Sequence, residues 1–528
     1  MKKLDLIPVS FRLLPLMLVM AAMGILAVAI DLWWVTLIVG VVAAVPLAVL
    51  AILRKKLTWG LIALSVVLYA AVAIVNVELT ARDIAVYKGN AAVVGRIAEV
   101  QSSDGYVTAV VLDNVTIRGD KVKGKCLVKI DVDAGYADGD VPDEYVVGTP
   151  LAVGDQVRVW GKVSTFRLSF FDSYQMHRVL DGVYYQQEMS ELTVKERAVG
   201  RTPAEKAQNA ILNVLVDRMG WDVGSLAYAM LLGDTSKLSG DVARGYRSAG
   251  IAHLLAVSGL HVGLLMGLIL LLLKACRCPV RWRWLPTLAI LLPYAWLCGW
   301  SPSVLRAGTL AVVALLAKSI GRRYDPPSMW SLAALILLLA RPLWLFDVSF
   351  LLSFAAYGGI ICLLPLVRDL FGRVERVPRL AFLAKTPKWL KDALAINLAV
   401  TASILPLSVY FFGGISGLTI PFNLIFVPLM SLVYSFLFVG TVLGLIWSGL
   451  SVLLYPAYGV IYLVNHAMVA LSGKGFWAFG FGLAGIPALY VGTMAASPYC
   501  RYPSRVKYPL AGGFALLGIL LSVFLAAY

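Results

Sequence analysis

The chain has 528 residues, of which 60% are hydrophobic and 14% charged, and its mean hydropathy is +0.82. An average soluble domain is about 25% charged, so this composition excludes an ordinary soluble protein. Apolar stretches of roughly 20 residues, the length that a helix needs to cross ~30 Å of hydrocarbon, recur along the chain. The sequence therefore predicts an integral membrane protein with many crossings.

The formal net charge of +16 is distributed unevenly. Residues 78–210 contain 16 Lys+Arg and 19 Asp+Glu, a net of 16 − 19 = −3, so the remainder carries 46 − 16 = 30 against 30 − 19 = 11, a net of +19. These cations cluster in short loops beside apolar stretches, for example Arg54-Lys55-Lys56, Lys274 to Arg283, and Arg322-Arg323. Such clusters mark cytoplasmic loops. The excess charge indicates topology and does not by itself indicate a polyanionic partner.

Three apolar stretches open the chain, at 12–30, 33–53 and 57–77, so residues 1–77 are predicted as a three-span membrane region. The polar interval 78–205 then lies outside the cytoplasm. Further spans are expected at 250–273, 284–299, 303–318, 328–345, 346–365, 394–412, 418–446, 451–471, 482–497 and 508–527. The predicted fold is a mainly α, polytopic helical bundle of about 13 spans, with residues 250–528 forming the multi-span domain.

The polar interval is rich in short β patterns. Alternating or β-branched runs occur at 91–100, 106–117, 125–132 and 151–163, separated by Gly, Asp and Asn turns. Several short strands in about 100 residues predict a small all-β domain, with an OB-like closed barrel as one option. Residues 206–249 are predicted as an amphipathic helical segment along the membrane interface.

An unusual polar group of residues lies in the expected span 250–273, where His253, Ser258, Gly259 and His261 interrupt apolar sequence. Polar side chains at membrane depth are costly unless they face protein or water. One interpretation is a seam that lines a pore or cavity. The other is a helix-packing face whose polar groups bond to neighbouring carbonyls, and the sequence leaves both open.

The same residues include the side-chain types that bind metals or act in catalysis. On one continuous helix, His253 and His261 would be separated by about 12 Å of rise, too far for one metal ion. Ser258 and His261 would share a helix face, as a nucleophile and its base require, but no acid partner for the histidine is evident. We therefore predict no metal, no cofactor and no catalytic residue, and keep an intramembrane serine hydrolase only as a minor alternative.

Other polar residues at span ends have two interpretations each. Arg306 either lies at the interface with its charge in water, pairs with Asp347, or meets phosphate with its planar donors. Asn423 and Asn397 are either helix-packing groups or ligands along a transport path.

The β domain carries candidate contacts for unpaired bases. Stacking of a base on an aromatic ring contributes ~1–3 kcal/mol, and cations follow the backbone. The candidates are Trp160, Phe166, Phe171 and Tyr174 for stacking, with Lys121, Lys123 and Lys125 for phosphate. Core packing of the aromatics and a solvated loop for the lysines are the competing interpretations.

The run from Gly250 through His253, Ser258, Gly259 and His261 to Gly263 resembles the signature of the ComEC competence-protein family. The resemblance continues in order and spacing over residues 225–450. It includes the segments Ser303-Val304-Leu305-Arg306-Ala307, Gly321-Arg322-Arg323-Tyr324-Asp325-Pro326, Ser349 to Phe354, Ile404-Leu405-Pro406 and Pro421-Phe422-Asn423. The first part is similar to the family's amino-terminal module, three spans followed by an OB-like domain.

The resemblance implies a channel in the cytoplasmic membrane for one strand of DNA during natural transformation. It assigns His253, Ser258, Gly259, His261, Arg306 and Asn423 to the substrate path. The chain lacks the H-x-H-x-D-H run of the metallo-β-lactamase-like domain that ends many relatives, so nuclease activity is not expected. Separate helicase or ATPase, DNA-receptor and nuclease proteins are then the implied partners besides the lipid bilayer, and a homodimer is compatible. Transport of another solute remains the alternative, because hydropathy does not identify cargo. Leu351 stands where many relatives are expected to carry Gln.

Overall fold

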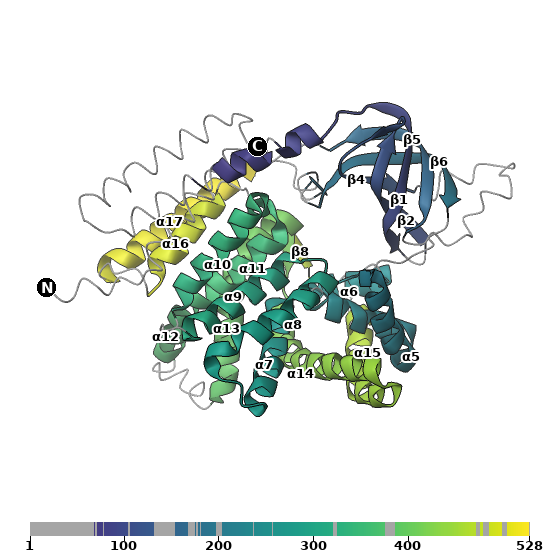
Figure 1. Cartoon of the computed structure of the whole chain (residues 1–528). Helices are drawn as coiled ribbons and strands as arrows, with labels where there is room; N and C mark the ends of the chain where they lie inside the picture. Colours follow the sequence, from purple (N-terminus) through teal and green to yellow (C-terminus); the bar gives the residue numbers. More distant parts are fainter. Residues whose placement is uncertain are drawn as a thin grey trace.

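The computed structural model of the chain contains a small β-barrel, a helical bundle and a carboxy-terminal pair of helices (Figure 1). It describes residues 68, 71–77, 79–103, 106–130, 154–166, 175, 178–179, 181–196, 203–235, 237–255, 257–319, 321, 325–374, 386–470, 476–478, 485–498 and 504–526. The spans expected at 12–30 and 33–53, and most of 57–77, lie outside the described residues.

The β domain is a sheet that closes on itself. Its strands are β1 (Gly89–Ser103), β2 (Tyr106–Ile117), β3 (Asp120–Lys121), β4 (Lys125–Lys129), β5 (Gln156–Thr165) and β6 (Val183–Glu196). Their order is β1-β5-β6-β4-β2-β3, and β1 also pairs with β2, which closes a ring of five strands. β4 and β6 are parallel, whereas the other pairs are antiparallel. The prediction of a small all-β unit is confirmed.

Strict alternation in β5 explains how the barrel forms its core. Val157, Val159 and Val163 point inward and are at most 1% exposed, whereas Trp160 points outward and is 43% exposed. Period-two alternation places one side of a strand in the core and the other in water. The buried Gln187 side chain donates from Nε2 to the carbonyls of Ala91 and Val159, so this amide nitrogen is paired inside the barrel.

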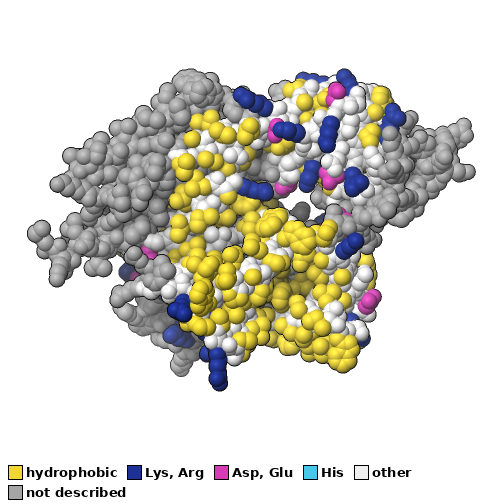
Figure 2. All heavy atoms as spheres, viewed as in Figure 1, with side chains coloured by type: hydrophobic (Ala, Val, Ile, Leu, Met, Phe, Trp, Pro, Cys, Tyr) yellow, Lys and Arg dark blue, Asp and Glu magenta, His cyan; other side chains and the backbone are white. Residues whose placement is uncertain are grey.

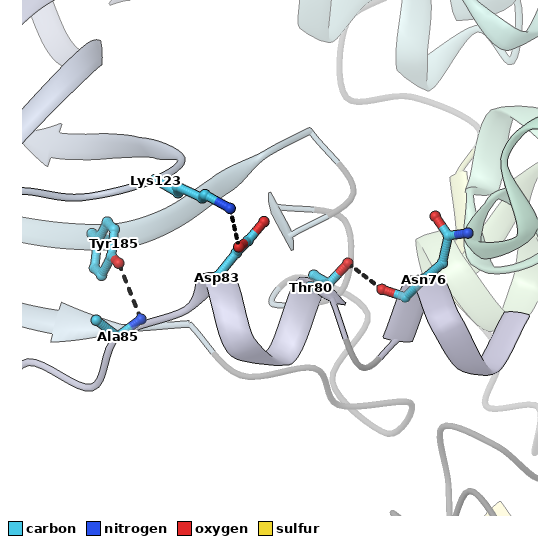
Figure 3. A network of polar contacts seen from close by, with 6 residues as sticks. All are labelled: Asn76, Thr80, Asp83, Ala85, Lys123 and Tyr185. Carbon is cyan, nitrogen blue, oxygen red and sulfur yellow. Dashed lines mark hydrogen bonds and ion pairs between the residues drawn. The ribbon is translucent and has the colours of Figure 1, made fainter.

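Helical residues 71–77 and 79–83 lead into the barrel, and two contacts fasten the end of the second segment to it (Figure 3). Lys123 Nζ donates to Asp83 Oδ1 over 2.7 Å, and the hydrogen bond and charge of Asp83 raise the pKa of Lys123. The backbone N–H of Ala85 donates to the hydroxyl of Tyr185 over 3.2 Å. These contacts fix the end of the helix against the barrel.

The bundle consists of helices of very different lengths. They are α5 (Pro203–Leu232), α6 (Gly240–Ser248), η2 (Ala252–Leu254), α7 (Gly259–Ala275), η3 (Val280–Trp282), α8 (Trp284–Leu297), α9 (Pro302–Ser319), α10 (Pro326–Ala340), η4 (Pro342–Phe346), α11 (Val348–Cys362), α12 (Leu364–Val374), α13 (Lys388–Phe412), α14 (Thr419–Ile446), η6 (Ser448–Leu454), α15 (Tyr455–Ala470), α16 (Gly485–Ala496) and α17 (Ser504–Ala526). The short strands β7 (Gly414–Ser416) and β8 (Phe476–Ala478) pair antiparallel. The main core joins α5, α7, α8, α14 and α15.

The structure places α5 differently from the interfacial helix that we expected within 206–249. α5 is interrupted at Gly220, where φ is 71° and the backbone is not helical. From Val223 to Leu232 every residue is buried, and the apolar residues from Leu226 to Leu232 belong to the same core as residues of α14 and α15. An all-round apolar helix belongs in a core and not at an interface. The shorter α6 has the expected amphipathic character.

Among the described residues, five stretches are long and apolar enough to cross a membrane: Pro302–Ser319, Lys388–Phe412, Thr419–Ile446, Ser448–Ala470, which joins η6 to α15, and Ala252–Ala275, which joins η2 to α7 across a break. A sixth is formed if α11 and α12, which meet at 43°, make one bent span. The expected total of about 13 is not confirmed. Helices such as α8 and α10 have 14 and 15 residues, which at 1.5 Å per residue are shorter than ~30 Å of hydrocarbon.

The surface agrees with a membrane protein. In Figure 2, hydrophobic side chains cover most of the visible bundle, while Lys and Arg gather over the β domain and at the lower edge of the bundle. Leu271, Ile425 and Leu463 are among the large apolar side chains that are more than half exposed. Apolar surface of this extent requires lipid or protein to cover it. The chain is a membrane protein with a polar β-barrel domain.

Candidate functional site

The chain breaks its helical path directly before α7. Residues 252–254 form the single turn η2, and α7 begins only at Gly259. His253 and His261 therefore do not lie on one helix, and our premise of a continuous helix through this stretch is wrong. Ser258 is the N-cap of α7 in extended conformation. A serine just before an apolar run, followed three residues later by a polar side chain, is the pattern of a capping box, and this signal was missed.

The capping box also defines how Ser258 and His261 interact. The Ser258 hydroxyl accepts from the backbone N–H of His261 over 3.5 Å, and His261 Nδ1 accepts from the backbone N–H of Ser258 over 3.3 Å. Each side chain therefore bonds to the other residue's backbone. A nucleophile requires its hydroxyl to donate to a base. This geometry holds a helix end and does not activate the serine.

His261 is part of a buried polar tier that joins four helices. Its imidazole is 1% exposed and stacks on the ring of Tyr434 of α14, with centroids 4.4 Å apart. The Tyr434 hydroxyl lies 2.9 Å from the hydroxyl of Tyr294 of α8, and Tyr294 donates to the carbonyl of Leu231 of α5 over 2.8 Å. His261 thus follows the helix-packing interpretation in this structure.

His253 differs from His261 in exposure. The side chain of His253 is exposed. The imidazoles of His253 and His261 are nevertheless close enough to interact electrostatically. Leu260, in the first turn of α7, is 40% exposed. The break before α7 therefore opens one histidine to the surroundings and buries the other.

Arg306 lies beside the first residue of α7. It occupies the start of α9, is 7% exposed, and its guanidinium carbon lies 5.9 Å from the centroid of Phe354. A Cβ on Gly259 would come within 2.5 Å of Arg306 Nη2, so only glycine allows this approach without a shift. Within the described residues, Arg306 Nε is buried without a hydrogen-bond partner.

The ion pair that we considered between Arg306 and Asp347 is not formed, although the structure describes both residues. Asp347 instead caps α11, and its Oδ1 accepts from the backbone N–H of Phe350 over 2.7 Å. A helix N-terminus prefers such an anionic cap.

A buried arginine and a helix N-terminus together make an anion-binding arrangement. The first N–H groups of a helix have no intrahelical partner, and the macrodipole adds about half a positive charge there. At α7 both positive features meet at Gly259, where Arg306 approaches. A buried charge is stable only when it is paired. The site is therefore suited to an oxyanion such as phosphate.

The two asparagines take different roles. Asn397 of α13 donates to the carbonyl of Ile420 over 2.9 Å and accepts from Thr401, so it joins α13 to the start of α14. Asn423, in the second turn of α14, keeps a buried Oδ1 without a partner among the described residues. Asn397 follows the packing interpretation, and Asn423 stays a candidate for the substrate path.

The candidate base contacts of the β domain differ in exposure. Phe166 is 6% exposed and belongs to the core, whereas Trp160 is exposed on β5. Lys121, Lys123 and Lys125 are exposed around β3 and β4. Phe171 and Tyr174 lie outside the described residues.

Two residues beside Trp160 were missed by the sequence interpretation. Arg158 and Lys162 are exposed on the same outward face of β5, two positions before and after Trp160. The strict alternation of 156–164 is the signal that predicts this stripe, once the inward face is assigned to the valines. The stripe places one aromatic ring between two cations.

No group of three or more His, Cys, Asp or Glu that could hold a metal ion occurs within the part of the chain that the structure describes. Cys276 and Cys278 are free thiols after α7. No residue set in the described part indicates a cofactor.

A comparison with protein families matches most of the bundle. A family model described as Competence protein matches residues 230–501. ComE operon protein 3 of Bacillus subtilis is 31% identical over 233 residues, 44% of this chain and 27% of that protein. Recombination protein 2 of Haemophilus influenzae is 29% identical over 262 residues, 48% of this chain and 32% of that protein.

An uncharacterised protein of Escherichia coli, YcaI, is 24% identical over 285 residues, 53% of this chain and 35% of that protein. The matches thus cover only about a third of these relatives' lengths. No solved structure matches the chain. The matched region 230–501 contains the break before α7, Arg306 and Asn423, whereas the β domain lies before it.

Proposed function

The chain belongs to the Competence protein family, and from that premise we propose that it passes one strand of DNA across the cytoplasmic membrane during natural transformation. The observation that carries this proposal is Arg306 at the N-terminus of α7. A buried guanidinium with an unpaired Nε, beside a helix N-terminus, has the donors and the positive charge that suit phosphate. A DNA strand presents such a group at every nucleotide.

The proposed path runs past His253 and Arg306. His253 is exposed at the break before α7. Ser258 and Gly259 follow it at the start of α7, and Gly259 lies beside Arg306. His261 does not face the proposed path, because its ring stacks on Tyr434; it holds the start of α7 in place. Asn423 contributes its unpaired Oδ1 from the start of α14. Gly259 lacks a side chain, and this allows the guanidinium of Arg306 to approach α7.

We further propose that the β domain is an OB-fold on the outer side of the membrane. A ring of five strands with a single parallel pair, β4 with β6, supports that assignment. The stripe of Arg158, Trp160 and Lys162 suits a single strand, because an aromatic ring stacks a base and cations attract the backbone. Lys121 and Lys125 add positive charge elsewhere on the barrel, while Lys123 is engaged by Asp83.

The full topology of about 13 spans, with basic loops in the cytoplasm, is part of the same proposal. Helicase or ATPase, receptor and nuclease functions then reside in separate proteins. The bundle is proposed to act without catalysis, alone or as a homodimer, and the capping role of Ser258 supports this over a serine hydrolase.

The proposal is tested by following labelled DNA in a naturally competent host. A strain that lacks this protein is expected to bind DNA at its surface but to deliver no label to the cytoplasm, and the intact gene restores delivery. Undiminished cytoplasmic label in the deletion strain contradicts DNA import and favours transport of another solute.

A further inference from the structure

A groove of about 520 Å³ runs between α7 and α9, away from the site described above. It is lined by Met266 and Leu270 of α7, by Ala311, Ala314 and Ala317 of α9, and by Lys318 at the end of α9. This volume is in the range of small-molecule sites, about 300–1,000 Å³. The walls are apolar except at one end.

Alanines of α9 line the groove, and glycines lie next to its lining on α7. Gly263 and Gly267 share a face of α7 with Met266 and Leu270, since they are three or four residues apart. A Cβ at either glycine would meet no atom within 4 Å, so this side of α7 is open among the described residues. Small residues in membrane helices usually allow close packing. Here no helix of the described part packs against the two glycines.

Basic side chains gather at one end of the groove. Lys318 lies in the last turn of α9 and Lys274 in the last turn of α7, and both are exposed. α9 also contacts η3, which carries Arg281. These residues belong to the loops that the charge pattern assigns to the cytoplasm. The groove thus combines an apolar wall at membrane depth with cations at the level of the cytoplasmic headgroups.

We propose that this groove binds an anionic phospholipid of the cytoplasmic leaflet, with one acyl chain along the alanines of α9 and its phosphate against Lys318 and Lys274. Basic pockets between membrane helices on this side favour anionic headgroups. A helix about 10–12 Å wide placed in the groove would instead cover Lys318 and take its ammonium into an apolar contact, which is costly. A phospholipid supplies the apolar chain and the anion in one molecule.

The proposal is tested with the purified full chain in mixed micelles of phosphatidylcholine and phosphatidylglycerol, with retained lipid measured by native mass spectrometry. The wild-type chain is expected to retain phosphatidylglycerol in preference to phosphatidylcholine. Lys318→Gln is expected to lower that preference about fivefold, the effect of removing one cation near a headgroup. Ala314→Leu is expected to abolish retention by filling the groove.

Two matched variants control for nonspecific effects. Ala289→Leu makes the same change at an exposed position of α8, and Lys388→Gln removes an exposed cation at the start of α13. Both are expected to retain phosphatidylglycerol as the wild type does, and added inorganic phosphate is not expected to displace it.

Three results overturn the proposal. The first is equal retention of the two lipids by the wild type. The second is equal retention by Ala314→Leu and Ala289→Leu. The third is that Ala314→Leu converts a dimer of the chain into a monomer while the amount of retained phosphatidylglycerol stays the same. That result would identify a helix of a second copy as the occupant of the groove. DNA import is not part of any readout, so failure here is distinct from failure of the proposed function.

Discussion

The imidazole of His261 and the phenol ring of Tyr434 lie parallel, with planes 7° apart and centroids separated by 4.4 Å. The two residues are 173 positions apart in the chain. Their stack joins the first turn of α7 to the middle of α14, and the hydroxyl of Tyr434 extends the contact to Tyr294. This tier fixes the start of α7, on which the Arg306 site depends.

The tier predicts a difference between two substitutions of Tyr434. Tyr434→Phe keeps the stack and loses one hydrogen bond, a cost of about 1 kcal/mol, while Tyr294 still donates to Leu231. Tyr434→Ala removes the ring from a site with 0% exposure and is expected to cost about 3–5 kcal/mol. Thermal unfolding of the purified chain measures both, and similar losses for the two variants contradict the stack's importance.

The approach of Arg306 to α7 predicts opposite outcomes at two glycines of the same helix. Gly259→Ala places a methyl group 2.5 Å from Arg306 Nη2 and must displace the guanidinium, so DNA import is expected to fall at least tenfold if about 1.4 kcal/mol of phosphate binding is lost. Gly263→Ala meets no atom within 4 Å and is expected to leave import unchanged.

Transformation frequency, normalised to the amount of protein in the membrane, measures this pair. Equal import by the two alanine variants at equal protein level contradicts a role for the Gly259–Arg306 approach.

The turn before η2 predicts a folding defect. Gly250 has φ +76°, and a Cβ there would overlap Thr419 Oγ1 at the start of α14. Gly250→Ala is therefore expected to reduce the folded protein recovered from membranes strongly. Gly299→Ala changes a glycine of similar φ, +64°, that meets no atom within 4 Å, and is expected to cost only about 1 kcal/mol. Gel filtration of the extracted protein compares them, and equal recovery contradicts the steric argument.

Burial raises the pKa of the Cys126 thiol in the barrel to about 12 from its usual 9.0. The unfolded thiol ionises above pH 9 while the folded one keeps its proton, so stability is present below pH 9 and falls by about 1.4 kcal/mol per pH unit from there toward pH 12. At pH 8 the folded barrel is expected to protect Cys126 from iodoacetamide, whereas exposed Cys276 reacts. Mass spectrometry of the alkylated peptides measures this, and early modification of Cys126 contradicts the buried site.

Local patterns predicted much of the fold. The period-two runs around Val157 and Trp160 predicted a β domain, and the apolar stretches predicted a membrane bundle. The closure of the barrel depends on the pairing of β1 with β5 and of β4 with β6, which are strands distant in the sequence, and no local pattern contains these pairings. The burial of Val223–Leu232 likewise depends on α14 and α15, which follow about 200 residues later.

The candidate site was predicted as a set of residue types, but not in its geometry. The sequence identified Arg306 and Gly259 separately, while their contact depends on how α9 lies against α7. His253 and His261 look equivalent in the sequence. The capping box at Ser258 separates them, and Tyr434 then covers one ring. Tertiary packing therefore decides which polar side chain stays accessible.

The most direct test of the proposed DNA path is to place a photoreactive amino acid at the position of His253 and irradiate cells during uptake of labelled DNA. The same amino acid in place of His466, which is exposed on α15, is the control. The account predicts covalent labelling of the incoming strand at position 253 and none at position 466. Normal DNA import without labelling at position 253 would contradict a path past the start of α7.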